Sequence, residues 1–122
     1  MTSPGAKIAW ADAQALSSTY DESTVATLIG MLDDPDEDVL AAAADALGHI
    51  GPAGSAAWEP LVRLLSQEHP GWLRDTCAYA LGRIGVRNSQ VVEALVAATQ
   101  EHGSNVAERA REALEILREQ LR

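Results

Sequence analysis

The chain has 122 residues, enough for one domain with a modest core, and a formal net charge of −9 at pH 7. Apolar residues make up 47% of it but aromatic residues only 4%, so Ala and Leu, both strong helix formers, supply most of what can be buried. No basic stripe is present to neutralise nucleic-acid phosphates, and no apolar run approaches the ~20 residues of a membrane span. We therefore expect an all-α protein that binds neither nucleic acid nor membranes.

The acidic excess lies entirely in the first half of the chain. Residues 1–60 contain ten acidic side chains and one basic side chain, Lys7, whereas residues 61–122 contain eight of each. A negative surface of this kind favours a basic protein partner, although it also serves solubility alone. The single cysteine, Cys77, excludes an intrachain disulfide and fits a reducing cytoplasm.

Apolar periodicity predicts seven helices along the chain. In order, they cover residues 6–19, 23–33, 36–50, 55–67, 71–84, 88–101 and 104–121. We call the first, third, fifth and seventh of these the A helices and the others the B helices. An A helix and the B helix that follows it form one unit. A single domain over residues 1–122 then contains units at 6–33, 36–67 and 71–101 and a half unit at 104–121.

The A helices repeat one another in sequence. The segment DALGHIG (45–51) returns as YALGRIG (79–85), 34 residues later, and a third copy without the glycines follows around Leu114. Their apolar residues recur at i, i+4, i+7, i+8 and i+11, which places them on one helix face. In the first A helix the equivalent positions, at an offset of 31, are held by Ile8, Ala15, Leu16 and Thr19.

Glycines recur at two places in these copies. Gly51 and Gly85 end A helices, where a left-handed residue is favoured and glycine adopts that conformation without strain. Gly48 and Gly82 lie inside the last helical turn, where glycine costs roughly 1 kcal/mol of helix propensity, so a packing reason is expected. We expect the B helix of the same unit to approach closely there.

The three B helices also align with one another, at offsets of 33 and 34. Two neighbouring apolar positions recur in them, one held by Leu28, Leu61 and Leu95 and the next by Ile29, Val62 and Val96. Trp58 falls at a position that holds valine in the other two B helices, so we expect it in the core. A single hairpin of this size cannot bury its apolar face, whereas stacked copies bury a continuous one.

The strings DPDEDVLAAAADALGHIG (34–51) and LRDTCAYALGRIG (73–85) resemble the short HEAT-like repeats of the phycobilin-lyase type. The arginine that this pattern carries after its first apolar position is replaced by Leu40 in one copy and restored as Arg74 in the next. The likeness extends over roughly residues 8–121. It implies a right-handed α-solenoid of about 3.5 helical hairpins, with seven helices in all.

In HEAT-like proteins the B helices usually line the concave face of the solenoid, where partners bind. The resemblance therefore implies a partner-binding face on the B helices, and the residues that we expect to point outward from it are Met31, Glu59, Arg63, Gln67 and Glu93. Trp72, near the start of an A helix, joins them as an exposed aromatic anchor. A solvated polar face without a partner is the alternative for all of them.

The residues offer little catalytic chemistry. The HEAT-repeat enzyme deoxyhypusine hydroxylase holds iron through His-Glu pairs, and no His-Glu pair occurs in this chain. The segment QEH stands at both 67–69 and 100–102, but its spacing matches no established metal site, and loops repeat when units repeat. Cys77 aligns with Ala43 and Ala110, which indicates a buried small residue rather than a nucleophile. We expect no catalytic residues, no metal and no cofactor.

Three functions fit these features. The first is a non-enzymatic protein-interaction module that binds its partner through a concave B-helix face and the acidic N-terminal half. The second is a small acidic inhibitor or immunity-type partner of a basic protein, and the third, implied by the resemblance alone, is a chromophore-handling protein like the phycobilin lyases.

The final helix has no B helix after it. We therefore expect Ile116, Leu117 and Leu121 to be only partly covered. This end is a simple cap, a surface for self-association or the cut edge of a longer array.

Overall fold

All the regular secondary structure of the described chain is helical. The computed structural model describes residues 3–17, 20–102 and 105–120, and within those ranges it contains no strand. The elements are α1 (Pro4–Leu16), α2 (Glu22–Gly30), the 3₁₀ segment η1 (Met31–Asp33), α3 (Glu37–Ile50), the 3₁₀ segment η2 (Gly51–Ala57), α4 (Trp58–Ser66), α5 (Gly71–Ile84), α6 (Ser89–Ala98) and α7 (Val106–Glu119). The predicted all-α fold is confirmed, and each α-helix overlaps the range predicted for it. Over the same described residues, no helix has the length and apolar character needed to cross a bilayer.

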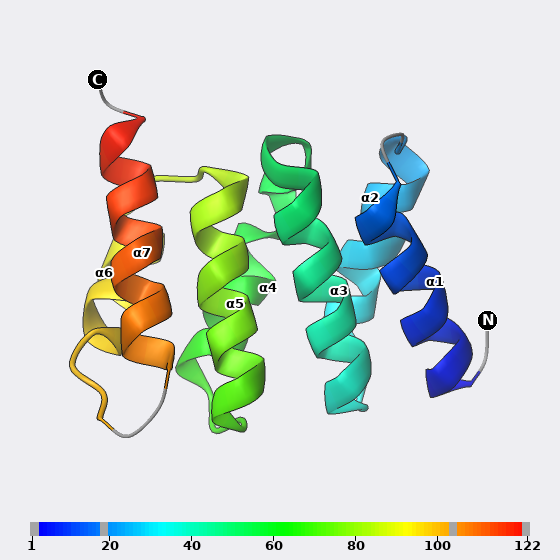
Figure 1. Cartoon of the computed structure of the whole chain (residues 1–122), viewed down its shortest axis with the longest axis horizontal. Helices are drawn as coiled ribbons and strands as arrows, with labels where there is room; N and C mark the ends of the chain where they lie inside the picture. The colour runs from blue at the N-terminus through cyan, green and yellow to red at the C-terminus, as the bar shows by residue number, and fades with distance from the viewer. Residues whose placement is uncertain (1–2, 18–19, 103–104, 121–122) are drawn as a thin grey trace.

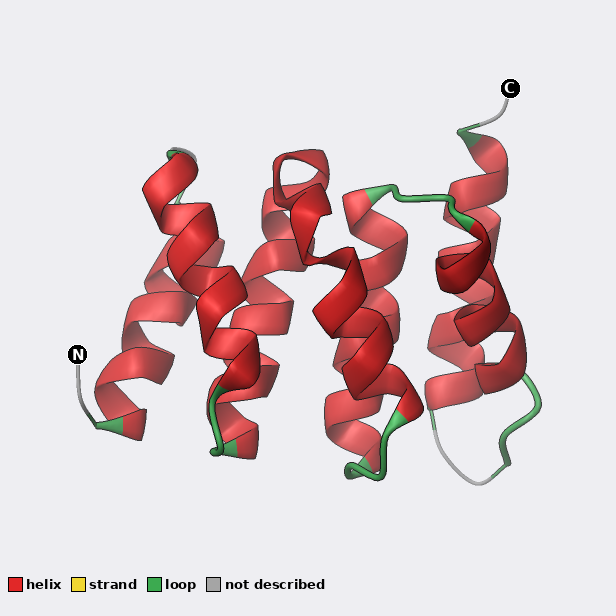
Figure 2. Ribbon diagram, turned by 180° about the vertical axis from the view of Figure 1, so that it is seen from behind, coloured by secondary structure: helices red, strands yellow, loops and turns green. Residues whose placement is uncertain are grey.

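The helices form two layers (Figure 1). α1, α3, α5 and α7 stand side by side in one row, and α2, α4 and α6 lie behind them, as the view from the back shows (Figure 2). The first row corresponds to the A helices predicted from the sequence and the second row to the B helices. Successive hairpins pack against one another, so that order along the chain and order along the stack are the same. This is the α-solenoid that the repeated sequence predicts.

Residues 51–57 depart from the B helix predicted at 55–67. They wind as η2, and the α-helix begins only at Trp58. Gly51, with φ 79° and ψ −140°, ends α3 outside the left-handed region expected of it, whereas Gly85, with φ 78° and ψ 16°, lies within that region. Pro52 follows Gly51 and has no N–H to offer a continuing helix. The extra turns of η2 place it between α3 and α4, where it also contacts α2.

Four α-helices begin at a side chain that caps them. Ser3, Asp21 and Asn88 each accept a hydrogen bond from the backbone N–H three residues later, and Asp36 accepts from the second and third N–H after it. Such caps satisfy N–H groups that have no partner within the helix. Helix starts are therefore set by local side chains, and the faces that the helices bury are set by packing.

Gly48 and Gly82 allow the A helices to approach one another. A Cβ at Gly82 would lie 2.7 Å from the Cα of Ala113 in α7, and a Cβ at Gly48 would lie 2.5 Å from the Tyr79 ring and 3.3 Å from the Cα of Ala80 in α5. The expectation that the B helix of the same unit fills this space is wrong, because the neighbour is the next A helix in both cases. Ala80 and Ala113 are buried, so backbone meets backbone with little side chain between.

The two layers are unequally spaced. The A helices touch through backbone and small side chains, whereas α2 and α4 scarcely contact each other. η2 contacts both α2 and α4 and lies in the gap between them. That the B helices line a concave face stays a prediction.

The first hairpin follows a different register from the predicted one. Leu16, aligned with the fully buried Leu47, is 90% exposed, and the buried residue of α1 is Ala11 instead. Thr19, the last position of the predicted pattern, lies outside the described residues. α1 has neighbours on one side only, so a single buried face is enough to hold it, and its faint repeat pattern is a weak guide to that face.

α7 lies at the other end of the stack. Ile116 is half-buried as predicted, but Leu117 is only 3% exposed because α7 packs against both α5 and α6. The partly exposed leucine of this helix is Leu114. Leu121 lies outside the described residues.

Two ion pairs tie the start of an A helix to the loop after its own B helix. Lys7 Nζ lies 2.6 Å from Asp34 Oδ2, and Arg74 binds Glu101 through two guanidinium nitrogens. In each pair the partners are 27 residues apart, so a similar contact occurs in the first and third units. In the second unit the positions aligned with Arg74 and Glu101 hold Leu40, which is buried, and Gln67. Relative to the third unit, the second unit thus lacks both charges of the pair, which avoids leaving one of them unpaired.

Replacing Gly82 by Ala is expected to destabilise the fold by about 2 kcal/mol, because the added methyl group would overlap the backbone of Ala113. Gly48→Ala is expected to cost less, since the atom nearest its new methyl group belongs to the edge of the Tyr79 ring. Urea unfolding followed by circular dichroism measures both effects. Gly30→Ala is the matched control: nothing lies within 4 Å of its added methyl group, and helix propensity should stabilise this variant by up to ~1 kcal/mol. A neutral or stabilising Gly82→Ala would contradict the close approach of α5 and α7.

Replacing Glu101 by Gln is expected to lower the free energy of unfolding by about 1–2 kcal/mol at neutral pH, because Arg74 loses a charged hydrogen-bond partner. The hydrogen bonds from Arg74 hold the pKa of Glu101 below its usual value. The pair therefore stabilises the fold above the pKa of the unfolded carboxyl, and this stabilisation is lost as the pH falls through the folded-state pKa. The difference between wild type and variant should shrink toward about pH 3 in urea unfolding.

The control for this series is Glu112→Gln. Glu112 pairs with Arg109 on the exposed surface of α7, so the substitution should change stability by less than about 0.5 kcal/mol. A Glu101→Gln effect that stayed constant across the pH range would show that the carboxylate charge contributes nothing.

Candidate protein-binding groove

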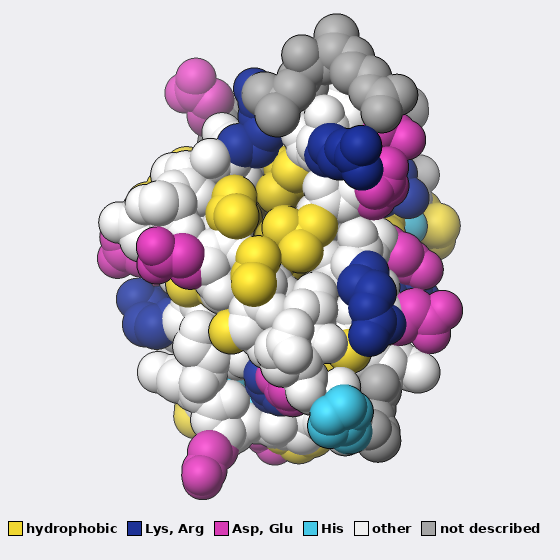
Figure 3. All heavy atoms as spheres, turned by 90° about the vertical axis from the view of Figure 1, so that its left-hand side faces the viewer, with side chains coloured by type: hydrophobic (Ala, Val, Ile, Leu, Met, Phe, Trp, Pro, Cys, Tyr) yellow, Lys and Arg dark blue, Asp and Glu magenta, His cyan; other side chains and the backbone are white. Residues whose placement is uncertain are grey.

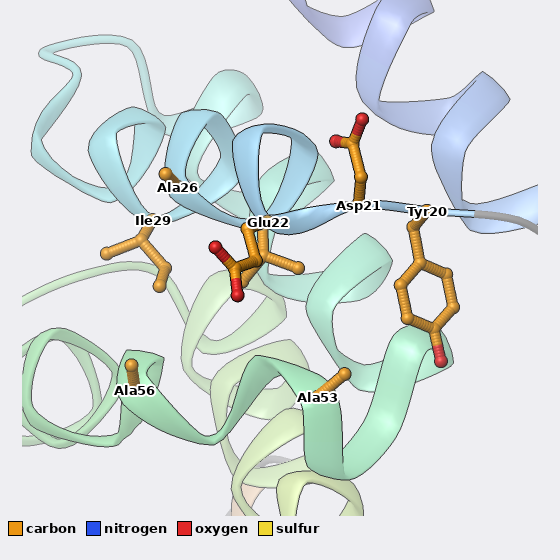
Figure 4. A pocket seen from close by; sticks show the side chains of 8 residues that line it. Tyr20, Asp21, Glu22, Ala26, Ile29, Ala53 and Ala56 are labelled. Carbon is orange, nitrogen blue, oxygen red and sulfur yellow. The ribbon is translucent and has the colours of Figure 1, made fainter.

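A groove opens on the B-helix side of the stack, between α2 and η2. Its volume is about 560 Å³ and its walls are mainly apolar. Figure 4 shows α2 on one side of the gap and η2 on the other. The residues that line it are Tyr20, Asp21, Glu22, Val25, Ala26, Ile29, Ala53 and Ala56. The groove exists because the B layer is splayed at this junction and because η2 presents only alanine side chains to it.

α2 supplies the longer wall. Val25 and Ile29 are one helical turn apart and half-buried, so each packs against the core with one side and borders the groove with the other. The Glu22 carboxylate points into the gap (Figure 4). Asp21 points away from it and accepts a hydrogen bond of 2.9 Å from the backbone N–H of Thr24 (Figure 4). This bond, with those from neighbouring hydroxyls, holds the pKa of Asp21 below its usual value. Asp21 therefore caps α2, and Glu22 is the carboxylate that faces the groove.

η2 forms the other wall of the groove with small alanine side chains, and Tyr20 closes one end of the groove. Ala56 points across the gap toward Ile29 (Figure 4). The Tyr20 hydroxyl donates a hydrogen bond of 3.3 Å to the carbonyl oxygen of Ile50, in the last turn of α3, while 41% of the residue stays exposed. An aromatic ring anchored by its polar end leaves its apolar faces available for contact.

The groove lies in a strongly negative part of the molecule. No Lys or Arg occurs between Lys7 and Arg63 in the sequence. Both of these cations are bound to aspartates, Lys7 to Asp34 at 2.6 Å and Arg63 to Asp33 at 3.1 Å. The hydrogen bond from Lys7 keeps the pKa of Asp34 below its usual value, so that this pair is charged at neutral pH. The field around the groove is therefore set by carboxylates.

The structure separates most of the residues predicted to bind a partner. Met31 is only 7% exposed, so the expectation that it points outward is wrong; it stands three residues after the buried Leu28 and aligns with the buried Leu64 of the next B helix. Glu59 on α4 and Glu93 on α6 are exposed, and Trp72 in the first turn of α5 is 49% exposed. None of these residues lines the groove between α2 and η2.

Arg63 and Gln67 are brought together. They border a polar pocket of about 280 Å³, lined also by Leu32, Asp33, Asp34, Leu40, Leu64 and His69. Arg63 binds Asp33, and the ring nitrogens of His69 lie 3.0 Å from Glu37 Oε2 and 3.3 Å from Gln67 Oε1. The polar groups of this pocket are thus engaged with one another, which fits a structural cluster that joins the first two units.

One feature of the sequence indicates the groove, although the residues predicted to bind a partner were not chosen from it. The apolar row beside the core leucines of the B helices is only partly covered: Ile29 and Val62 are half-buried, and Val96 is 48% exposed. Trp58, predicted in the core, is half-buried as well. A helix that buries one apolar row against the core and carries a second, partly exposed row beside it has surface available for a further contact. Tyr20 and Ala53 were missed because they lie in segments predicted to connect helices. Ala56 falls in the B helix predicted at 55–67, whose first residues wind as η2 instead.

The described residues offer no metal centre. Within residues 3–17, 20–102 and 105–120, no cluster of three or more His, Cys, Asp and Glu side chains is placed to hold a metal ion. Cys77 is fully buried, as predicted, and burial raises the pKa of its thiol to about 12, an effect that the charge of Arg74 offsets only in part. The thiol is therefore protonated and inaccessible, which suits a core residue.

Comparison with known proteins identifies the repeat. A family model described as HEAT repeats matches residues 1–58 and residues 25–115, which together cover most of the chain. The chain belongs to the HEAT-repeat family. The HEAT-like resemblance of the segments at 34–51 and 73–85 is thereby confirmed. A search of curated proteins finds no sequence that matches.

A solved structure shows the same fold. The designed armadillo repeat protein YIII(Dq)4CqI is similar to this HEAT-repeat chain with a TM-score of 0.68 and 20% sequence identity, over 96% of this chain and 60% of the designed one. The chain thus spans about 60% of the length of that protein. Stacks of HEAT and armadillo repeats generally serve as scaffolds for protein–protein interaction, through the extended surfaces that stacking creates.

Native Cys77 is expected to react with a thiol reagent such as DTNB at least ~100-fold more slowly than the urea-unfolded chain, because its thiol is buried and protonated. Absorbance after mixing at mildly alkaline pH measures the rate. An exposed Ser89→Cys introduced into a Cys77→Ala background serves as the accessible control, and Cys77→Ala should fold because Ala43 and Ala110 hold the equivalent buried positions. Rapid labelling of the folded wild type would contradict a core role for Cys77.

Proposed function

We propose that this HEAT-repeat protein is a non-enzymatic interaction module that binds a basic, amphipathic segment of a partner protein in the groove between α2 and η2. The proposal keeps the B-helix side and the acidic N-terminal half as the binding surface and narrows them to one groove. The observation that carries it is an apolar groove of about 560 Å³ with the Glu22 carboxylate at its rim, in a half of the chain whose one basic side chain, Lys7, is already paired.

The walls suit an apolar anchor. Val25 and Ile29 provide branched aliphatic surface on one side, and the alanines of η2 leave room on the other for a large side chain. The volume lies within the range of pockets that hold a ligand or a few side chains. Burying one large apolar side chain contributes roughly 1.5–3 kcal/mol, so a useful affinity requires further contacts beside the anchor.

Charge supplies those contacts. A Lys or Arg beside the anchor can reach the Glu22 carboxylate and the exposed face of Tyr20, which attracts cations through its ring. The surrounding carboxylates also draw a basic segment toward the groove from a distance, and this attraction weakens as salt is added. The partner that these features favour is therefore amphipathic and basic rather than merely apolar.

A peptide-display selection on the purified protein tests the proposal. Selected peptides are expected to combine a large apolar residue with Lys or Arg within a few positions of it. Ile29→Glu should abolish their binding, because it places a charge in the apolar wall. Glu22→Lys should raise the Kd by about ten-fold at low salt, as measured by isothermal titration calorimetry.

The control is Glu108→Lys, which makes the same charge change at an exposed position of α7 and should leave the Kd within about two-fold. Glu93→Lys, on α6, distinguishes this groove from the wider B-helix side and should behave like the control. Acidic selected peptides, or basic ones whose binding survives Ile29→Glu, would overturn the proposal.

A further inference from the structure

We propose that the C-terminal end of the stack binds the α1–α2 end of a second copy of this chain, so that copies assemble head to tail. This association is separate from partner binding in the groove between α2 and η2. Its basis is an apolar hollow at one end of the stack, an exposed leucine at the other, and opposite charge around the two.

α6 and α7 leave an apolar hollow at the end of the stack. Val92, Leu114 and Leu117 line a space of about 460 Å³, and Arg87 and Arg118 border it. Figure 3 shows hydrophobic side chains gathered at this end, with basic side chains on either side of them. Val92 and Leu114 are partly exposed to water. Exposed apolar patches of this kind mark surfaces to which another molecule can bind.

The interior of the stack shows what covers this position elsewhere. Leu114 is equivalent to Leu47 and Leu81, and both of these are fully buried where a following hairpin continues the stack. The hollow therefore has the form of a docking face for a further A helix. Among the described residues, α1 stands at the opposite end of the A row and packs on α3 alone in that row (Figure 1). A second copy can present α1 to the hollow.

α1 offers apolar surface that fits the hollow. Ala9, Ala13 and Leu16 are exposed and spaced to share one side of the helix, and Leu16 is 90% exposed. A leucine flanked by alanines can enter a hollow lined by three aliphatic side chains without displacing a large group. Asp12 is exposed on the same side, one turn before Leu16.

Charge selects head-to-tail over tail-to-tail association. Arg87 is exposed, and Arg118 lies 3.8 Å from Glu115, too far for a strong pair. The α1–α2 end carries Asp12 on α1, with Asp21 and Glu22 beside the neighbouring groove, and its one cation, Lys7, is bound to Asp34. Head-to-tail contact brings arginines to carboxylates, whereas two C-terminal ends would bring arginines to arginines. Because the two surfaces differ, association need not close on itself and can extend beyond a dimer.

Sedimentation equilibrium over a range of concentrations tests this proposal. The average mass of the wild-type chain should rise past that of a dimer at low salt and fall toward that of the monomer as salt is added. Leu114→Glu places a charge in the apolar hollow, and Leu16→Glu places a charge on the apolar surface of α1. Each variant alone should therefore be monomeric. An equimolar mixture of the two should form a one-to-one dimer and nothing larger, because one intact surface of each kind remains.

Two further variants keep the test clear of misfolding and of partner binding. Arg87→Glu changes an exposed residue and should weaken association by about ten-fold at low salt. Ile29→Glu alters the groove between α2 and η2 and should assemble like wild type. Thermal melts show which variants are folded. A wild type that is monomeric at every concentration, a Leu16→Glu variant that assembles alone, or a mixture that does not dimerise would overturn the proposal.

Discussion

The close approach of consecutive A helices is the constraint on which the rest of this structure depends. At Gly82 no side chain separates α5 from the backbone of Ala113, and at Gly48 only the edge of the Tyr79 ring and the backbone of Ala80 stand in the way. In the other layer α2 and α4 scarcely contact each other, and η2 contacts both of them. The gap that η2 only partly fills is the groove proposed for partner binding.

The distribution of charge differs between the two ends of the stack. Acidic residues dominate the first half, where the one cation, Lys7, is bound to Asp34, and arginines border the apolar hollow at the far end. The pairs Lys7–Asp34 and Arg74–Glu101 brace the first and third units in the same way, while the second unit carries buried Leu40 instead. The units are therefore alike in backbone but unlike in charge, so the two ends of the molecule are chemically different.

The repeat made the fold readable from the sequence, because each unit buries the same positions against its neighbours. Leu47 and Leu81 are fully buried as their alignment indicates. Alignment could not say which neighbour meets Gly48 and Gly82, since periodicity gives the face of a helix and not what packs on it. It failed for Leu16, at the end of the stack, where one side of the pattern has no neighbour to enforce it. Met31 was misplaced for another reason: it aligns with Leu64, which is buried, so the alignment indicates a core position that the predicted binding face did not take into account.

The proposed site lies where the repeat is broken, and this explains why motif reasoning did not find it. η2 occupies the place where a regular B helix would begin, and its segment GPAGSAA carries no side chain larger than proline. Leucine or valine side chains in place of these alanines would fill the space beside Val25 and Ile29. The small residues of η2 instead leave that row of α2 open beside Glu22. The groove therefore differs from the equivalent surfaces of the other units through η2, a segment whose winding the repeat period does not predict.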